Sequence, residues 1–356
     1  MPHWAGLKSI SEIESRAASG AHASAADVAV WAGVSKATVS RVLSGEPRYI
    51  RPATRDRVLE AVRVLNYRPN LVASSMRTGR TFMIALVIPD ITNPFWPEVA
   101  RGVQDRAAIA GYHVVVANAD WHAEREAKFL AFAADSRMDG LIVNPSGPVE
   151  AVLTTGRPVV LLGSRSDELL CDVVTSDTYG GVRLATRHLL EHGHRRIGFI
   201  RGRGGGAGAR QRGYADELDD WGLKVDEAYI AEVQYTLLGG QLGARELLTL
   251  GEPPTALLGA NDLLAVGAIF AARDLGIAVP DDLSVIGVDD TPMAAATWPG
   301  LTTVAKPKYD IGRTAFEMLL ERMVNDEEGL PAQRVVLPVS LVERGSVAHP
   351  RRTWTW

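Results

Sequence analysis

The segment Ser24-Ala-Ala-Asp-Val-Ala-Val-Trp-Ala-Gly-Val-Ser-Lys-Ala-Thr-Val-Ser-Arg-Val-Leu43 predicts two short helices joined by a tight turn. Ser24 and Asp27 have the spacing of a capping box, with Asp in place of the usual Glu. Gly33 stands at the turn, because glycine adopts positive φ without steric cost. Ser35 is suited to cap the second helix. These features are typical of a helix-turn-helix, whose second helix enters the major groove of DNA.

The two helices of this segment have distinct faces. Apolar side chains recur at helical spacing on the inner faces, at Val28, Ala29, Ala32, Val39, Val42 and Leu43. The outer face of the second helix carries Lys36, Ala37, Ser40 and Arg41. Taken alone, the segment also fits a small helical hairpin with a solvated basic face, since short helix-turn-helix patterns recur by accident.

The charge distribution favours a nucleic-acid partner for this region. Residues 24–80 contain ten Lys and Arg but four Asp and Glu, a net charge of +6. The whole chain has a net charge of −4, so the remainder carries −10. A small basic region on an acidic body is expected of a phosphate-binding module joined to a domain that does not bind DNA.

Size and composition indicate a globular protein of two or three domains. The chain has 356 residues, of which 46% are hydrophobic and 22% charged. No apolar run is long enough to span a bilayer, and residues 1–23 lack the apolar core of a signal peptide. The one cysteine, Cys171, excludes an intramolecular disulfide and fits a reducing cytoplasm, and no partner can be assigned to it for catalysis. We therefore expect a cytoplasmic protein without membrane association.

A third helix and a short connecting segment follow the first two helices. Pro52 opens the third helix, where its missing N–H does no harm, and Pro69 breaks it. Val58, Ala61, Val62 and Leu65 provide the apolar stripe that closes a three-helix core. Residues 70–76 are too few to form a stable helix alone, because helix nucleation is costly. This segment can therefore be coil off DNA and helix on it.

From residue 83 the pattern changes to alternating strands and helices. Predicted strands cover residues 83–90, 113–118, 140–144, 158–163, 172–176, 196–201, 228–234, 256–260, 283–288 and 301–304. Predicted helices cover residues 97–110, 123–134, 180–191, 209–221, 239–250, 262–275 and 310–324. This alternation predicts an α/β fold with parallel sheets covered by helices on both faces. The strands are too many for one sheet of ordinary width, so we expect two doubly wound subdomains.

These segments together resemble the lactose/galactose repressor (LacI/GalR) family of bacterial transcription regulators. The resemblance runs over residues 24–345, in order and at suitable spacing. It is carried by Asp27-Val28-Ala29, Ala32-Gly33-Val34-Ser35, Thr38 to Leu43, Leu65-Asn66-Tyr67, Met76 to Gly79, Ile88 to Phe95, His192 to Ile197, Arg210, Gly213-Tyr214, Ala260-Asn261-Asp262, Val285 to Asp290 and Leu301 to Val304.

The resemblance implies a non-enzymatic regulator that binds a palindromic operator in double-stranded DNA as a homodimer and responds to a small molecule, a sugar or sugar derivative. It implies a body like periplasmic sugar-binding proteins, with the chain crossing between lobes near Ser176, Lys306 and Pro338. The expected domains are a flexible leader (1–23), in which residues 11–18 can form a short helix, a headpiece (24–68), a hinge helix or linker (69–81), the body (82–345) and a tail (346–356). Lobe 1 would comprise 82–176 and 307–337, and lobe 2 would comprise 177–306 and 338–345.

The expected DNA contacts follow from side-chain type. Arg41 can bond guanine O6 and N7 in a bidentate manner, and Ala37 can touch a thymine methyl group. Lys36 lies where the family reads its operator. Side chains suited to phosphates are those of Ser35, Thr38, Ser40, Tyr67 and Asn70. Met76 aligns with the family's leucine wedge, which enters the minor groove, and Ala73 is small enough to permit that approach. The alternative for Met76 is ordinary packing of a linker.

The resemblance also predicts the residues of an effector site. Arg210, Asn261 and Asp289 would bond ligand hydroxyls, and Asp90, Asn93 and Phe95 would line the other lobe. Tyr235 and Lys306 complete the set, Tyr235 as an aromatic face for a sugar ring and Lys306 where relatives often carry Gln. Some of these acidic positions could instead be structural: Asp262 could cap the next helix, and at least one of the adjacent Asp289 and Asp290 is expected to serve structure.

Two short motifs suggest other chemistry. The string His188-Leu-Leu-Glu-His192 matches an inverzincin pattern, and residues 202–207 match G-x-G-x-x-A. The first falls at a helix end, and the second is not in a first βαβ unit, so we expect neither a metal site nor a dinucleotide cofactor. The remaining alternatives are a transport-type sugar-binding protein, which would not need residues 24–80, and an α/β enzyme, for which no catalytic constellation assembles.

Overall fold

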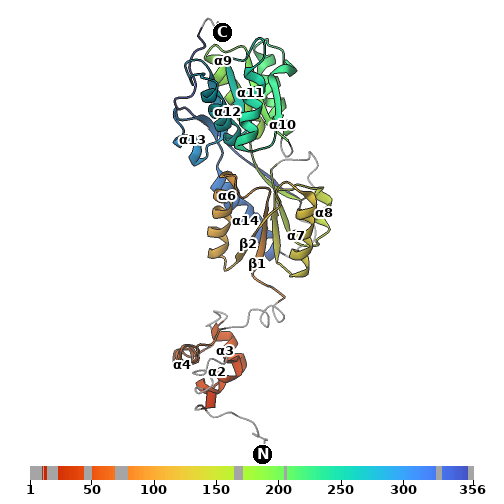
Figure 1. The fold of residues 1–356 in the computed structure, drawn as a ribbon. Coiled ribbons are helices and arrows are strands. Elements are labelled where there is room, and N and C mark those ends of the chain that lie inside the picture. Colours follow the sequence, from red (N-terminus) through yellow and green to blue (C-terminus); the bar gives the residue numbers. More distant parts are fainter. Residues whose placement is uncertain are drawn as a thin grey trace, which may run out of the picture. The chain divides into compact units, whose positions relative to one another are not determined.

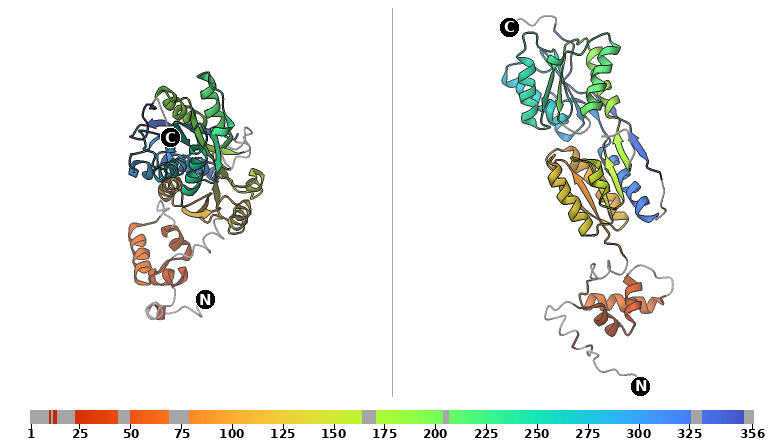
Figure 2. Two further views of the ribbon diagram at one scale, coloured as in Figure 1. Left: turned by 45° about the horizontal axis from the view of Figure 1, so that its top comes forward. Right: turned by 90° about the vertical axis from the view of Figure 1, so that its right-hand side faces the viewer.

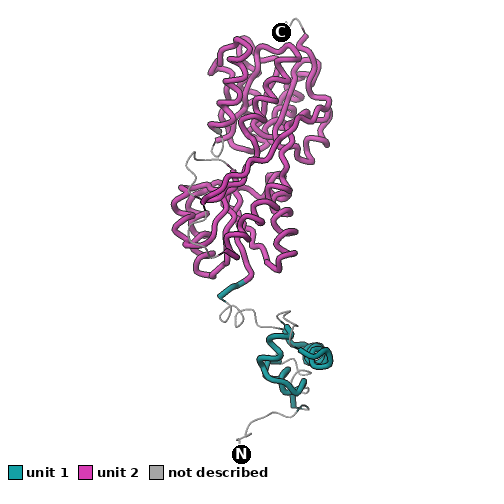
Figure 3. The backbone as a smooth tube through the Cα atoms, turned by 180° about the vertical axis from the view of Figure 1, so that it is seen from behind, with its two compact units in different colours: residues 1–81 teal, residues 82–356 magenta. Residues whose placement is uncertain are grey.

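The structure is a computed structural model that describes residues 10, 12–13, 23–43, 50–68, 79–163, 171–203, 207–325 and 331–351. The chain forms two compact units, residues 1–81 and residues 82–356 (Figure 3). Among the described helices, none combines the length and the apolar character that a membrane crossing requires.

The first unit contains the predicted helix-turn-helix. Helix α2 (Ala25–Ala32) begins with a capping box, in which the Asp27 amide donates to Ser24 Oγ at 3.3 Å and the Ser24 amide donates to Asp27 Oδ2 at 2.9 Å. The turn passes through Gly33 at φ +62°. Helix α3 (Lys36–Leu43) then begins where Ser35 Oγ accepts from the Thr38 amide at 3.1 Å. The predicted caps and turn residue are thus confirmed.

Helix α4 (Pro52–Val64) closes a small apolar core with α2 and α3. Its fully buried members include Val28, Val39, Val58 and Ala61. Ile13 is also buried in this core, with 2% of its surface exposed, and residues 10, 12 and 13 are helical. We expected residues 1–23 to be a flexible leader with room for a short helix at 11–18, and the helical residues 12 and 13 fall within that helix. The proposed hinge residues 69–78 lie outside the described residues.

The second unit consists of two α/β lobes (Figure 1). The sheet of lobe 1 has the order β11-β5-β4-β3-β1-β2, with all neighbours parallel. Its strands are β1 (Met83–Ile88), β2 (His113–Asn118), β3 (Gly140–Val143), β4 (Val159–Leu162), β5 (Asp172–Ser176) and β11 (Arg334–Leu337). Its helices are α6 (Phe95–Ile109), α7 (Ala123–Asp135), α8 (Val149–Leu153) and α14 (Lys308–Val324).

The sheet of lobe 2 has the order β12-β10-β9-β8-β6-β7, in which only the edge pair β10–β12 is antiparallel. Its strands are β6 (Ile197–Gly202), β7 (Ile230–Val233), β8 (Ala256–Gly259), β9 (Ser284–Asp289), β10 (Thr302–Ala305) and β12 (Ser340–Val342). Its helices are α9 (Thr178–Glu191), α10 (Ala207–Asp220), α11 (Leu237–Leu248), α12 (Asp262–Asp274), α13 (Pro292–Ala296) and the 3₁₀ turn η2 (Glu227–Tyr229). The predicted α/β fold with two parallel-dominated sheets is confirmed.

The chain passes between the lobes three times. It leaves lobe 1 between β5 and α9, returns between β10 and α14, and leaves again between β11 and β12. The right-hand view of Figure 2 shows each sheet with helices on both of its faces. Alternating strand residues explain this layering in lobe 1. Ile84 and Leu86 pack toward α6 and α14, whereas Ala85 and Val87 pack toward α7 and α8.

Helices α6 and α14 approach one another through glycines. A Cβ atom added at Gly102 would overlap the Tyr309 carbonyl oxygen, and one added at Gly312 would overlap the Val99 carbonyl oxygen. Gly240 of α11 and Gly267 of α12 make the same kind of approach in lobe 2. Backbone contact of this kind leaves no space for a methyl group, so these four positions require glycine for packing.

Three differences from the predicted elements have a local cause. The short strands β11 and β12 were missed, because both lie at sheet edges and no residue of either strand is fully buried. The predicted strand 228–234 begins instead with η2, in which the Asp226 carboxylate accepts from the Ala228 amide at 3.0 Å. Helix α13 was missed because its five residues are too few to show a helical period.

The glycine contacts predict a stability difference between two matched variants. Gly312→Ala should lower the free energy of unfolding of residues 82–356 by about 3 kcal/mol, because the new methyl group displaces α14 from α6. Gly208→Ala, on α10 with nothing within 4 Å of the added Cβ, should raise it by up to about 1 kcal/mol. Urea unfolding followed by circular dichroism measures both. Equal stability of the two variants would contradict the packing argument.

Candidate nucleic-acid interface and ligand cavity

Helix α3 presents a polar face away from the core of the first unit. Lys36, Ala37 and Arg41 are exposed, whereas Val39 on the opposite face is fully buried. The apolar positions therefore orient the helix, and the exposed face holds one cation at each end with a methyl group beside the first. This face is short, basic at both ends and rigidly supported, as reading of a DNA groove requires.

Some of the hydroxyl groups beside this face already form hydrogen bonds within the protein. Ser35 Oγ accepts from the Thr38 amide and lies 2.9 Å from Thr38 Oγ1. Ser40 is half-buried. Tyr67 packs against the helical core, and its amide donates to the Val62 carbonyl at 2.9 Å. The other predicted DNA contacts, Asn70, Ala73 and Met76, lie outside the described residues.

In the second unit, a cavity of about 110 Å³ lies between the two lobes. Parallel strands direct their carboxyl ends to one edge of a sheet, and ligands of such folds bind beyond that edge. In this protein, residues from both lobes line the cavity. The lining residues are Asn93, Phe95, Trp96, Trp121, Asn144, Leu162, Gly163, Val174, Thr175, Ser176, Thr178, Ala209, Arg210, Tyr235, Asn261, Asp289, Lys306 and Ile311.

Seven of the eight predicted effector residues line this one cavity: Asn93, Phe95, Arg210, Tyr235, Asn261, Asp289 and Lys306. They come from segments up to 213 positions apart, which the crossings between lobes bring together. Asp90 is the exception and requires a correction. Its carboxylate accepts from the Thr92 amide at 2.8 Å and from Thr92 Oγ1 at 2.6 Å, so it stabilises the turn after β1 and does not line the cavity.

Several lining residues were missed by the sequence reading. Asn144 follows β3 and Ser176 ends β5, so their position at the carboxyl ends of predicted strands is a signal that could have found them. Trp121, after β2, had no signal in the sequence. Its ring stacks on that of Tyr235 from the opposite lobe, with centroids 5.6 Å apart and an angle of 20° between the planes. This stack joins the two lobes at the edge of the cavity.

Three amide side chains in the lining each use one end for structure. Asn93 Oδ1 accepts from the Phe95 amide at 3.0 Å, and Asn261 Oδ1 accepts from the Leu264 amide at 3.0 Å. Asn144 Nδ2 donates to the Leu162 carbonyl at 2.7 Å. Each bond fixes its side chain within the lining. Asn261, not Asp262, is therefore the N-cap of α12.

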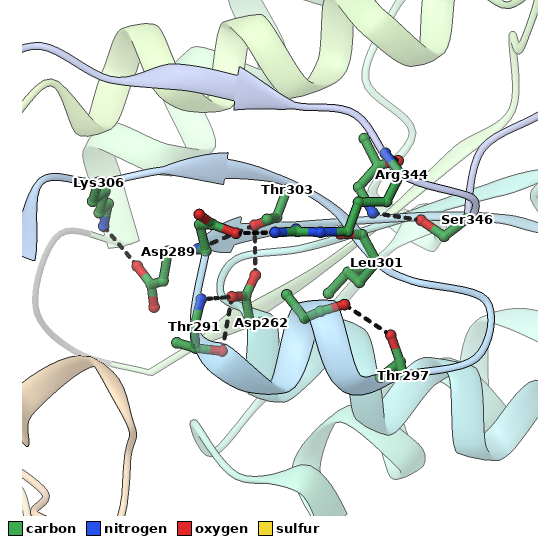
Figure 4. A network of polar contacts seen from close by, with 12 residues as sticks. Asp262, Asp289, Thr291, Thr297, Leu301, Thr303, Lys306, Arg344 and Ser346 are labelled. Carbon is green, nitrogen blue, oxygen red and sulfur yellow. Dashed lines mark hydrogen bonds and ion pairs between the residues drawn. The ribbon is translucent and has the colours of Figure 1, made fainter.

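Asp262 instead organises the loops behind the cavity (Figure 4). Its carboxylate accepts from the Thr291 amide at 2.6 Å, Thr291 Oγ1 at 3.0 Å and Thr303 Oγ1 at 2.6 Å. Burial, together with the negative charge of Asp289, raises the pKa of Asp262. These bonds hold the start of α13 and strand β10 to the N-terminus of α12.

Two lysines are buried at the second crossing. Lys306 Nζ lies 3.2 Å from Asp289 Oδ1, and both side chains are 6% exposed. Lys308 Nζ donates to the carbonyls of Asp289 and Asp290, each at 2.9 Å, and lies 3.6 Å from Glu98 Oε2 of lobe 1. Lys308 thus ties the end of β9 in lobe 2 to the first turns of α14 and α6 in lobe 1.

The adjacent Asp289 and Asp290 have different roles. Both have positive φ, at +122° and +55°, so the backbone bends sharply after β9. Asp289 lines the cavity and pairs with Lys306. Asp290 Oδ1 lies 2.7 Å from Arg344 Nη2, which connects it to the C-terminal segment. The expectation that at least one of them serves structure therefore applies to Asp290.

The structure describes the whole of the His188–His192 motif but only part of the glycine-rich motif at residues 202–207. His188 and His192 lie on adjacent turns with ring centroids 4.4 Å apart, and His192 Nδ1 lies 2.8 Å from the His188 carbonyl oxygen. Burial lowers the pKa of His188. Within the described ranges, no group of three or more His, Cys, Asp or Glu side chains is arranged to hold a metal ion. Residues 204–206 of the glycine-rich segment lie outside those ranges.

Sequence comparisons identify the relatives of this chain. A profile described as "Bacterial regulatory proteins, lacI family" matches residues 25–70, and one described as "Periplasmic binding protein-like domain" matches residues 186–347. Catabolite control protein A of Priestia megaterium is 36% identical over 319 residues, which cover 88% of this chain and 95% of that protein. The transcriptional repressor CytR of Escherichia coli K12 is 34% identical over 332 residues, covering 90% and 95%.

Structural comparisons agree with these relatives. The lac repressor dimer bound to operator and the anti-inducer ONPF superposes with a TM-score of 0.82 at 27% identity, covering 92% of this chain and 99% of that chain. The transcriptional regulator CelR in complex with cellobiose has a TM-score of 0.69 at 30% identity, covering 91% and 100%. These relatives are transcriptional regulators and not enzymes. The chain therefore belongs to the lacI family of bacterial regulatory proteins and is a DNA-binding transcriptional regulator.

Proposed function

We propose that the protein acts in the cytoplasm as a homodimeric repressor that binds a two-fold symmetric operator. Its affinity for that operator changes when a sugar occupies the cavity. The observation that carries the proposal is the combination, in one chain, of the exposed polar face of α3 with a cavity lined from two lobes. A transport-type binding protein would share the cavity but would have no use for the packed core of α2, α3 and α4.

In this proposal α3 reads the major groove. The Arg41 guanidinium forms a bidentate pair with guanine O6 and N7, and the Ala37 methyl group contacts a thymine methyl group. Lys36 at the start of the helix also faces bases. Ser35, Thr38, Ser40 and Tyr67 supply hydroxyls to phosphates, which set the register of the helix without reading sequence.

The segment after the headpiece completes the DNA contact in this proposal. Asn70 bonds a phosphate, and Met76 inserts between base pairs in the minor groove, an approach that the small Ala73 permits. Each chain carries one such headpiece, so a dimer reads two half-sites related by a two-fold axis.

The base-reading role of Arg41 has a direct test. Arg41→Ala should reduce the ratio of Kd values for scrambled and specific duplexes by about 10–100-fold, because a bidentate pair contributes about 1–3 kcal/mol of discrimination. The specific duplex is first selected from a random pool with the wild-type protein, and fluorescence anisotropy measures both affinities.

The matched control removes the same charge from α4. Arg63 is 76% exposed and pairs with Glu60 on its own helix, so Arg63→Ala should leave the discrimination ratio unchanged. An Arg41→Ala protein that discriminates as well as the wild type would overturn the assignment.

The cavity combines aromatic faces with amide and hydroxyl groups, a lining typical of sites for polyhydroxy ligands. Phe95, Trp121 and Tyr235 provide the rings. Asn93, Asn144 and Asn261 provide fixed amides, which select ligands that satisfy their hydrogen bonds. The titles of two solved relatives name cellobiose and ribose as their ligands. These observations support a sugar as the effector.

The crossings between lobes offer a route from the cavity to the DNA-binding unit. Lobe 1 begins at residue 83, directly after the linker, so a change in the angle between lobes moves the attachment points of the two headpieces in a dimer. Lys308 and the Trp121–Tyr235 stack contact both lobes, so a change in the lobe angle would alter these contacts. A ligand that contacts both lobes therefore biases the lobe angle and, through it, operator affinity.

An apolar groove on lobe 2 is suited to a second copy of the chain. It has a volume of about 640 Å³ and lies over α12, α13 and the loop that follows, with Ile269, Phe270, Met293 and Pro299 among its lining residues. Trp298 beside them is 95% exposed, an unusual state for so large an apolar side chain. The matched lac repressor structure is described as a dimer. We infer that this groove forms part of the dimer interface.

Replacing the exposed tryptophan tests this interface. Trp298→Glu should raise the dissociation constant of the dimer by about 30-fold or more, because buried interface aromatics commonly contribute about 2 kcal/mol. Sedimentation velocity measures the change. Phe132→Glu, at a 56% exposed position on α7, is the control and should leave the dimer unchanged. A Trp298→Glu protein that dimerises as tightly as the wild type would exclude the groove.

A further inference from the structure

One tryptophan of lobe 1 is packed into the apolar core of lobe 2. Trp121 lies in the loop that follows β2, yet its side chain packs against the core cluster of lobe 2. It also lines the cavity and stacks on Tyr235, with the ring centroids 5.6 Å apart. Trp121 is therefore a wall of the cavity that one lobe supplies and the other lobe supports.

The backbone that carries Trp121 is held in an uncommon conformation. Asp120 and Trp121 both have positive φ, at +48° and +60°, a region that residues other than glycine rarely adopt. The Trp121 amide donates to the Pro89 carbonyl at 3.2 Å, and Asp120 Oδ1 accepts from Asn118 Nδ2 at 2.7 Å. Such a conformation persists only where surrounding contacts impose it. These contacts fix the point from which the indole extends toward lobe 2.

The ring of Tyr235 is held from the side of lobe 2. A Cβ atom added at Gly202, the last residue of β6, would overlap this ring, so the glycine is needed to seat it. The Tyr235 hydroxyl accepts from Arg210 Nη1 at 3.2 Å, and Tyr235 is 7% exposed. Both rings of the stack are thus fixed by contacts that a ligand would have to break in order to displace them.

The cavity beside this stack is small. Its volume is about 110 Å³, whereas sites for drug-sized ligands have volumes of about 300–1,000 Å³. Asn93 of lobe 1 and Asn261 of lobe 2 both line it, so one small ligand can contact polar groups of both lobes. The space suits a single sugar ring better than two linked rings.

Trp121 is the large wall that a single substitution can remove without cutting into a sheet or a lobe core. Trp96 and Ile311, which also line the cavity, belong to the core of lobe 1. Ser176 and Asp289 end strands of the two sheets. The indole of Trp121 extends from a loop, so its removal enlarges the cavity while the layers of both lobes keep their packing.

We propose that Trp121 limits the effector to one sugar ring, and that its stack on Tyr235 excludes the second ring of a disaccharide. The inference rests on the proposed function, in which this cavity is the effector site. A ligand too large for a tightly packed site must displace packed groups before it binds, so the stack selects by size. Two solved relatives have ligands of different size, ribose in one and cellobiose in the other, so relatedness alone does not decide this point.

The test compares single sugars with disaccharides on the full chain. Isothermal titration calorimetry measures the binding of D-ribose, D-xylose, D-glucose and D-galactose beside cellobiose, maltose, lactose and xylobiose. At least one single sugar should bind, and every disaccharide should bind at least about tenfold more weakly than the tightest single sugar. Failure of all the single sugars to bind, or any disaccharide that binds within this tenfold margin, would overturn the proposal.

Variants at one position assign the size limit to the indole. Trp121→Ala should lower the ratio of Kd values for the tightest disaccharide and the tightest single sugar by about tenfold, because it opens space for a second ring. Trp121→Leu, which disturbs folding less, should lower the same ratio by a smaller factor, and Trp121→Phe, which keeps a ring for the stack, should preserve it. Circular dichroism shows that each variant is folded.

Trp221→Ala is the matched control. Trp221 is 39% exposed, follows the last residue of α10 and is outside the described lining, so this variant should keep the full ratio. If folded Trp121→Ala or Trp121→Leu protein keeps the ratio of the wild type, the indole does not set the size limit and the proposal fails.

The operator duplex separates this inference from the proposed function. A single sugar that binds the wild-type chain without changing operator affinity supports the size limit and contradicts the coupling between cavity and DNA. A disaccharide that alone binds and changes operator affinity supports the coupling and overturns the size limit.

Discussion

The structure depends on one constraint, that the carboxyl ends of two parallel sheets face one another across three chain crossings. Parallel strands place their following loops at one edge, so each sheet on its own would present half of a binding surface. The crossings bring the two halves together, and Lys308 joins them by bonding the carbonyls at the end of β9 while approaching Glu98 of the other lobe. The polar lining of the cavity is a consequence of this arrangement.

The same constraint explains why so many polar groups are buried. The Asp262 carboxylate, the two lysines of the second crossing and the amides at the strand ends all lie where loops meet, and each is held by hydrogen bonds or an ion pair. Satisfied polar groups of this kind define one geometry, since each donor or acceptor left without a partner in the interior would cost about 1–3 kcal/mol. Elsewhere the lobes rest on apolar layers and on helix pairs that touch through glycine, which tolerate no added methyl group.

Much of the fold followed from local patterns. Capping residues and Gly33 act within a few positions of themselves, so the helix-turn-helix could be predicted from its own segment. Buried strands such as β1 show as apolar runs and were found with small errors at their ends. The edge strands β11 and β12 were not found, because their half-exposed residues show no strong pattern and their pairing partners are up to 161 positions away.

The sequence by itself determined the basic headpiece, the parallel α/β body and seven side chains of the cavity, because each of these depends on residue type at local spacing or on a resemblance across the whole chain. Only the tertiary structure decided that Asp90 stabilises a turn, that Asn261 caps α12 in place of Asp262, and that Trp121 stacks on Tyr235. Trp121 and Tyr235 are 114 positions apart in the sequence, so their rings meet only when both lobes have folded. Asp90 and Asn261 bond residues two and three positions away, but neighbouring acidic and amide side chains compete for such local bonds, and only the folded backbone shows which side chain makes them.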